Sequence, residues 1–178
     1  HPRQSTPRSH AAVWPVSGPY PGELQRCLSA AGFGGSVLLW LSNGGVGAAD
    51  DAARGPIRLV ESGPAAGALA GSWFARRLGE DRLLCFDMGG TTAKPCIVDD
   101  GLPLSSRHFE VARSYRFRRG SGLPVRVPVI EMVEIGAGGG SIASVDGMSR
   151  IRVGPRSAGS EPGPASYGKG GEQPTVTD

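Results

Sequence analysis

The strongest chemical signal in the sequence is a turn in which a carboxylate precedes two glycines and two hydroxyl side chains. The stretch reads Phe86-Asp87-Met88-Gly89-Gly90-Thr91-Thr92, with short apolar segments on both sides. Phosphate binding needs backbone N–H donors that no side chain covers, and adjacent glycines offer them. A carboxylate at such a turn can hold Mg²⁺, usually through water. The pattern indicates a phosphate-binding turn; an ordinary Gly-Gly hairpin turn is the alternative interpretation.

A second glycine cluster follows an apolar segment and reads Ile135-Gly136-Ala137-Gly138-Gly139-Gly140-Ser141-Ile142. A loop with so few side chains can pass close to a ribose, an adenine ring or another backbone. The alternative is a glycine-rich bend at a packed crossing. The turn at Asp87 fits neither the P-loop pattern GxxxxGK[ST] nor the dinucleotide pattern GxGxxG, so it differs from both of those nucleotide-binding turns.

The elements that must position these turns change in character near residue 80. Residues 1–20 are rich in Pro and Ser and are expected to be irregular. Residues 21–80 are expected to be rich in helix, with helices over 22–31 and from Ser62 to Gly79. From 81 on we expect strands at 83–86, 94–98, 104–112, 125–135 and 150–153, while residues 154–172 are too rich in Gly and Pro to be regular.

Composition excludes some classes of protein. The 178 residues are 39% apolar, which suits a globular domain, and no apolar run reaches the length of a membrane span. The net charge of +3 owes much to arginines between Arg113 and Arg126. A basic binding module is therefore an alternative, but without a recognition motif we expect neither a nucleic-acid nor a membrane partner. The three cysteines lack metal-site spacing.

Several stretches, in order along residues 36–178, together resemble the hydantoinase A / 5-oxoprolinase family. They are Leu41-Ser42-Asn43-Gly44-Gly45, Val60-Glu61-Ser62-Gly63-Pro64-Ala65-Ala66-Gly67, the turn at 86–92, the cluster at 135–142, Val153-Gly154-Pro155-Arg156-Ser157-Ala158-Gly159, Pro162-Gly163-Pro164-Ala165 and Thr175-Val176-Thr177-Asp178. The strand–turn–strand around Asp87 is similar to the phosphate hairpin of actin/hexokinase/Hsp70 ATPases.

The resemblance implies an α/β fold: a fragment of an actin-like (ribonuclease H-like) ATPase with a mixed sheet, flanking helices and a long Gly/Pro-rich loop. Residues 21–80 would be the end of the first lobe with its connecting helix, and 81–178 the start of the second lobe. The implied activity is the ATP-dependent opening of a cyclic amide such as hydantoin or 5-oxoproline. ATP would phosphorylate the amide oxygen and make the ring carbon electrophilic for water. A cytoplasmic location and a B-type partner subunit are implied as well.

The same resemblance assigns roles to individual residues. ATP and Mg²⁺ (or another divalent cation) are the implied cofactors, and Glu61 would orient the cleft. At Lys94 many relatives carry a carboxylate, so a cation there would face phosphate instead. The site residues are Asp87 for catalysis and metal contact, Gly89, Gly90, Thr91 and Thr92 for phosphate, and Gly138, Gly139, Gly140 and Ser141 near the nucleoside. A non-catalytic truncated fragment and a carboxylase subunit of the acetone or acetophenone type are the alternatives.

Overall fold

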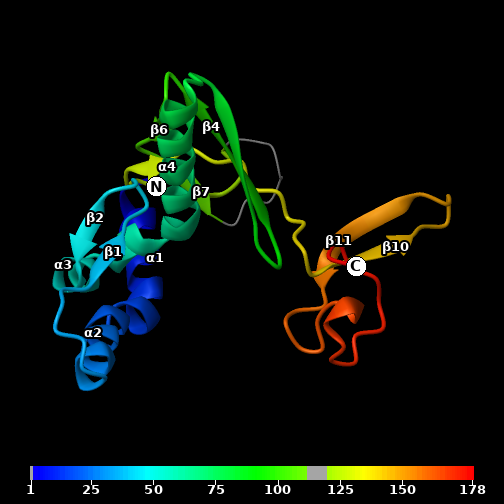
Figure 1. The fold of residues 1–178 in the computed structure, drawn as a ribbon, viewed down its shortest axis with the longest axis horizontal. Helices are drawn as coiled ribbons and strands as arrows, with labels where there is room; N and C mark the ends of the chain where they lie inside the picture. The colour runs from blue at the N-terminus through cyan, green and yellow to red at the C-terminus, as the bar shows by residue number, and fades with distance from the viewer. Residues whose placement is uncertain (1, 112–119) are drawn as a thin grey trace. The chain divides into compact units, whose positions relative to one another are not determined.

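The computed structural model describes residues 2–111 and 120–178, drawn in colour in Figure 1. The chain forms two compact units: His1–Cys85 with Cys96–Glu131, and Phe86–Pro95 with Met132–Asp178. The expected division near residue 80 is close to the first crossing between units, but residues 96–131 return to the first unit. The arginine-rich segment proposed for polyanion binding lies largely in 112–119, outside the described residues.

The first unit begins with two helices, α1 (Pro2–Ser17) and α2 (Tyr20–Ala30). The expectation that residues 1–20 are irregular is therefore wrong. Two prolines inside α1 weaken its intrinsic propensity, but contacts distant in sequence hold it. Thr6 Oγ1 accepts a hydrogen bond from the Arg126 amide at 2.9 Å, and Ser5 Oγ donates to the Pro124 carbonyl. Tertiary contacts thus override local preference.

Short elements connect these helices to the long helix α4 (Ser62–Leu78). They are the antiparallel pair β1 (Leu38–Trp40) and β2 (Val46–Ala48), the helix α3 (Ala49–Arg54) and the 3-10 turn η1 (Pro56–Leu59). Helix α4 ends at Gly79, whose φ of 72° is the left-handed conformation typical of a C-terminal stop. Its buried stripe consists of small residues, Ala65, Ala68, Ser72 and Ala75.

Helix α4 packs on a three-stranded sheet ordered β3 (Leu83–Met88), β4 (Ala93–Asp99) and β5 (Leu102–Pro103) (Figure 1). The approach is close at Gly71, where a Cβ would lie 2.1 Å from the Cys85 Sγ. The strands β3 and β4 confirm the two strands expected at 83–86 and 94–98. Their connecting turn is the predicted phosphate turn, so the sheet fixes both ends of it.

The hydrophobic core of the first unit is small and consists of β-branched residues. Ile57, Val125, Val127 and Val129 are buried together, and Val13, Val60, Phe109 and Val111 pack against them. Most of them lie in or beside α1, η1, β7 (Phe109–Val111), β8 (Leu123–Val125) and β9 (Val129–Ile130). Strand β7 pairs with β8, and β9 pairs with β6 (Ser105–Ser106). In the part of the chain that the structure describes, no helix has the length and apolar character needed to cross a membrane.

The second unit consists of the phosphate turn, the glycine cluster and a hairpin. The hairpin pairs β10 (Ser141–Val145) with β11 (Ile151–Ser157) antiparallel. A loop with the 3-10 turn η2 (Ala165–Tyr167) leads from β11 to the last residues. Strand β11 extends to Ser157, so the irregular region expected from residue 154 begins a little later.

Candidate functional site

The predicted phosphate turn closes through a single backbone hydrogen bond between its two ends. The Gly89 amide donates to the Thr92 carbonyl at 2.9 Å, which leaves Gly90 and Thr91 at the tip. Both tip residues are exposed. Within residues 2–111 and 120–178 the amides of Gly90 and Thr91 donate no hydrogen bond. The turn therefore offers two adjacent donors to a ligand.

The second glycine cluster lies directly against the back of this turn. The Gly139 amide donates to the Gly89 carbonyl at 2.9 Å, and the Gly140 amide donates to the Gly90 carbonyl at 2.8 Å. A Cβ on Gly138 would lie 2.5 Å from the Gly89 carbonyl oxygen and 2.6 Å from the Thr91 nitrogen. Such distances leave no room for a side chain, so the close approach of two backbones requires glycine at 138.

This contact determines the direction of the free amides. In a trans peptide the C=O and the following N–H point in opposite directions, and neither Gly89-Gly90 nor Gly90-Thr91 is among the cis bonds. The carbonyls of Gly89 and Gly90 both point at the glycine cluster. The amides of Gly90 and Thr91 therefore point away from it, side by side. Adjacent backbone N–H groups on one side of a turn can bind an anion.

The amides of the glycine cluster are all used within the chain. The amides of Gly139 and Gly140 are used by the turn, and the Gly138 amide donates to Ser141 Oγ at 2.9 Å. Ser141 is buried, and its own amide donates back to the Gly138 carbonyl at 3.0 Å. Gly139 and Gly140 thus support the turn through their amides, and Ser141 holds Gly138 in place. The predicted proximity of these four residues to a nucleoside stays a prediction.

The charged residues of the turn differ in environment. Asp87 is exposed and is the second-last residue of β3, two positions before Gly89. Lys94 is half-buried in β4 and already takes part in an interaction within the chain. Among the described residues, no group of three or more His, Cys, Asp or Glu side chains could enclose a metal ion. The expected contact between Asp87 and a divalent cation stays a prediction.

Thr177 and Asp178, to which the sequence assigned no role, support the glycine cluster from the side opposite the turn. The Thr177 amide and Thr177 Oγ1 both donate to the Gly139 carbonyl, at 3.0 and 2.9 Å. Farther along, the Val176 amide donates to the Ser141 carbonyl and the Ala143 amide to the Pro174 carbonyl. Residues 174–177 therefore run antiparallel to 139–143. The only signal in the sequence was the motif Thr175-Val176-Thr177-Asp178.

Asp178 organises the segment that carries Thr177. Its carboxylate accepts hydrogen bonds from the amides of Ser166 at 2.7 Å, Thr175 at 2.8 Å and Ala165 at 3.3 Å, and from Thr175 Oγ1 at 2.9 Å. These donors, the Ser166 amide foremost, hold the pKa of Asp178 well below its usual range. The carboxylate thus joins η2 to the final strand-like segment.

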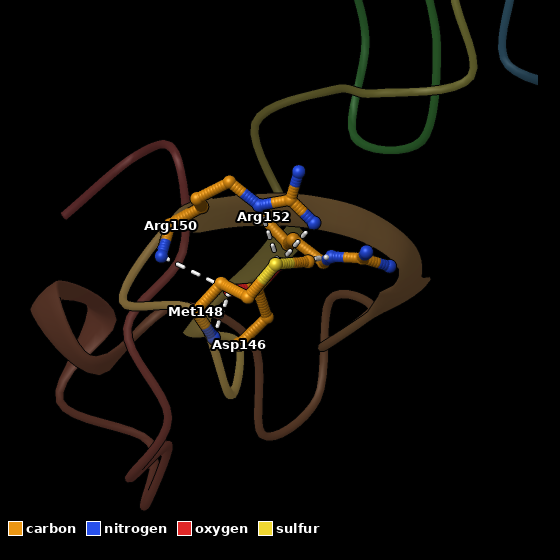
Figure 2. Close-up of polar contacts among 4 residues, drawn as sticks. All are labelled: Asp146, Met148, Arg150 and Arg152. Carbon is orange, nitrogen blue, oxygen red and sulfur yellow. Dashed lines mark hydrogen bonds and ion pairs between the residues drawn. The ribbon is translucent and has the colours of Figure 1, made fainter.

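A second carboxylate of similar type shapes the far end of the β10–β11 hairpin (Figure 2). Asp146 accepts from the amides of Met148 at 2.9 Å and Arg150 at 3.0 Å, and its other oxygen accepts from Arg150 Nε and Arg152 Nε, each at 3.0 Å. The Arg150 amide is the main cause of its lowered pKa. Within the described part of the chain, the hydrogen bonds of Asp146 reach neither the phosphate turn nor the glycine cluster.

Glu61, expected to orient a cleft, lies in the first unit. It immediately precedes α4 with a φ of 62°. A left-handed backbone is uncommon for Glu and costs on the order of 1 kcal/mol. Glu61 takes part in an interaction within the chain. Its role toward a ligand stays a prediction.

Comparison with known proteins agrees with the resemblance carried by the motifs. The sequence matches the family described as Hydantoinase/oxoprolinase over residues 3–178. It is 36% identical to caprolactamase subunit alpha of Pseudomonas jessenii over 99% of this chain and 24% of that protein. It is 38% identical to the acetophenone carboxylase gamma subunit of Aromatoleum aromaticum over 85% of this chain and 19% of that protein. The chain thus spans a quarter or less of these relatives.

A solved structure gives the same result in three dimensions. The crystal structure of the ATP-dependent caprolactamase from Pseudomonas jessenii superposes with a TM-score of 0.65 and 33% identity, over 99% of this chain and 24% of that one. The sequence match, which covers the turn, the glycine cluster and the final Thr-Val-Thr-Asp motif, and the common fold lead to one conclusion. This chain belongs to the hydantoinase/oxoprolinase family.

Proposed function

We propose that residues 1–178 are the segment of an ATP-dependent cyclic-amide hydrolase that carries the phosphate turn of the second lobe of an actin-like fold. The observation that carries this proposal is the pair of outward-facing amides at Gly90 and Thr91, supported from behind by the glycine cluster. Anionic phosphate oxygens are the ligands that such paired donors bind best. The similarity to a caprolactamase described as ATP-dependent supports the same function.

In the proposed site each residue has a limited task. The amides of Gly90 and Thr91 bind phosphate oxygens, and the hydroxyls of Thr91 and Thr92 extend the donor set. Asp87 orients water on the divalent cation, Mg²⁺ or a similar ion. The ATP supplies the phosphoryl group that activates the amide of the substrate, while the protein contributes positioning and charge stabilisation. The substrate class is a small cyclic amide: a hydantoin, 5-oxoproline or a related lactam.

The proposal includes a partner and a location. A B-type subunit or domain would complete the reaction, in keeping with the name of the caprolactamase relative, which is a subunit alpha. We further expect the enzyme to act in the cytoplasm. The partner is tested by isolating the full-length protein that contains residues 1–178 from its native cells and identifying what is purified with it. The location is tested by the cell fraction in which that protein is recovered.

The key experiment uses Gly90, because the fold does not need glycine there. An added Cβ at Gly90 meets nothing within 4 Å, and the residue has no positive φ. Gly90→Ala should therefore leave the free energy of unfolding nearly unchanged. It should weaken Mg-ATP binding by about ten-fold or more, since a methyl group would keep a phosphate oxygen from the amides. Calorimetric titration of Mg-ATP into the full-length protein measures this.

Two further variants complete the design. Gly147→Ala, also with nothing within 4 Å of the added Cβ, is the matched control and should bind like wild type. Asp87→Ala should weaken Mg-ATP about five-fold to ten-fold, the value of one water-mediated contact to a charged group. Equal affinity in Asp87→Ala and wild type would refute the role of Asp87. A wild-type protein that does not bind Mg-ATP would refute the proposed function.

A carboxylase is the second candidate, and the observation that favours it is the 38% identity to the acetophenone carboxylase gamma subunit. Both reactions would use the same phosphate turn, so the turn does not discriminate between them. Substrate-stimulated ATP hydrolysis does. Stimulation by a lactam or hydantoin without bicarbonate supports the hydrolase, whereas stimulation by a ketone that requires bicarbonate supports the carboxylase.

A further inference from the structure

We propose that Thr177 and Asp178 are positioning residues that set the direction of the phosphate-binding amides without touching the ligand. The inference rests on the proposed function of the turn and concerns the residues that hold the turn in place. The hydrogen bonds that support it all lie within the second unit. They form a continuous chain from Asp178 through Thr177 and Gly139 to the turn.

The first link is the peptide between Gly139 and Gly140. Its carbonyl accepts two hydrogen bonds from Thr177, and its N–H donates to the Gly90 carbonyl at 2.8 Å. Because the peptide is planar, fixing its carbonyl also fixes its N–H. Hydrogen bonds in such a chain polarise and strengthen one another. Thr177 therefore sets where the Gly90 carbonyl is held.

The second link reaches the ligand side. The Gly90 carbonyl shares its peptide with the Thr91 amide, so holding the carbonyl aims that amide outward. The preceding peptide is held in the same way, through the Gly139 amide and the Gly89 carbonyl at 2.9 Å, and aims the Gly90 amide. A rotation of either peptide would turn a donor away and present a carbonyl oxygen to phosphate, which repels it.

The third link fixes Thr177 itself. Asp178 binds the Thr175 amide and hydroxyl and the amides of η2, while the Thr177 amide and hydroxyl are both used by Gly139. A Cβ on Gly139 would lie 2.7 Å from Thr177 Oγ1, so the close approach of this hydroxyl also depends on glycine. The carboxylate of Asp178 thus holds the segment whose hydroxyl supports the turn.

The test combines a measurement that needs no nucleotide with one that does. Thr177→Val removes the hydroxyl at nearly constant volume, and Thr177→Ser retains it. We expect Thr177→Val to speed hydrogen exchange of the Gly139 and Gly140 amides about five-fold, the effect of one lost hydrogen bond. The same variant should weaken Mg-ATP binding to the full-length protein about three-fold to ten-fold. Thr177→Ser should restore both to wild-type values.

The two carboxylates supply a matched pair of variants. Asp178→Asn replaces one of two acceptor oxygens, which together bind three amides, by a donor. It should change both measurements in the same direction as Thr177→Val. Asp146→Asn makes the same chemical change at the far end of the hairpin. The hydrogen bonds of Asp146 there stay within the hairpin, so this variant should change neither measurement. If Asp178→Asn does not fold, Thr177→Val still tests the proposal alone.

The outcomes separate the two proposals. Unchanged exchange in Thr177→Val, or equal effects of Asp146→Asn and Asp178→Asn, would overturn the positioning role even if wild type binds Mg-ATP. Altered exchange in a protein whose wild type does not bind Mg-ATP would instead refute the proposed function of the turn. Weaker Mg-ATP binding with altered exchange, both rescued by Thr177→Ser, supports the positioning role.

Discussion

Replacing Gly138 by alanine should separate the phosphate turn from the glycine cluster. The added Cβ would lie 2.5 Å from the Gly89 carbonyl oxygen, 2.6 Å from the Thr91 nitrogen and 2.7 Å from the Gly90 carbonyl carbon, whereas ordinary contact begins near 3.4 Å. All three atoms belong to the backbone, so no side chain can rotate to relieve the contact. The two segments must move apart by about 0.9 Å, the difference between 2.5 and 3.4 Å.

That movement would break the two hydrogen bonds from the Gly139 and Gly140 amides, now 2.9 and 2.8 Å long, because both would exceed about 3.5 Å. At about 0.5–1.5 kcal/mol each, their loss predicts that Gly138→Ala lowers the free energy of unfolding by about 1–3 kcal/mol. Urea denaturation measures this change, and amide NMR shifts of the turn locate it. A Gly138→Ala protein as stable as Gly147→Ala, with unshifted signals of the turn, would refute the reasoning.

Two further predictions concern the first unit. Gly71→Ala, whose Cβ would lie 2.1 Å from Cys85 Sγ, should lower the free energy of unfolding by about 1–3 kcal/mol. Gly67→Ala, which has open space in the same helix, should raise the free energy of unfolding by about 0.5–1 kcal/mol. Equal shifts of the two urea midpoints would contradict the packing of α4 on β3. Burial, with smaller contributions from Cys85 and a glutamate, raises the pKa of the Cys96 thiol to about 11, so at pH 8 about one thiol in a thousand is ionised. Iodoacetamide should therefore modify exposed Cys27 in the folded protein and Cys96 only after unfolding or at much higher pH, and equal rates at pH 8 would show that Cys96 is not protected.

Local signals in the sequence located the turn and the elements beside it. The Ser62–Gly79 helix and the strands around Asp87 follow from apolar segments bounded by Gly, and the structure confirms them. The helix over residues 2–17 could not be predicted, because its stability comes from partners more than a hundred residues away. Chain composition says nothing about such partners.

The candidate site also has features that the sequence shows and contacts that it does not show. The glycines at 89–90 and 138–140 are visible in the sequence, but the sequence does not show that one cluster lies behind the other. That arrangement depends on backbone hydrogen bonds between residues about fifty positions apart. The roles of Thr177 and Asp178 depend on a further long-range contact, from Thr177 to Gly139. Periodicity and turn propensity describe neighbours along the chain and carry no information about such pairs.

The close approach at Gly138 also changes how sequence variants of this protein should be interpreted. The two glycine clusters are similar in sequence. A side chain at Gly138 has no space, however, whereas one at Gly90 meets nothing within 4 Å. A variant at Gly138 should therefore act through abundance: less folded protein, sensitive to temperature and to chaperones. A variant at Gly90 should leave the amount of protein unchanged and act through ligand affinity alone. Measuring soluble protein alongside activity would thus assign a variant in either cluster to misfolding or to loss of binding.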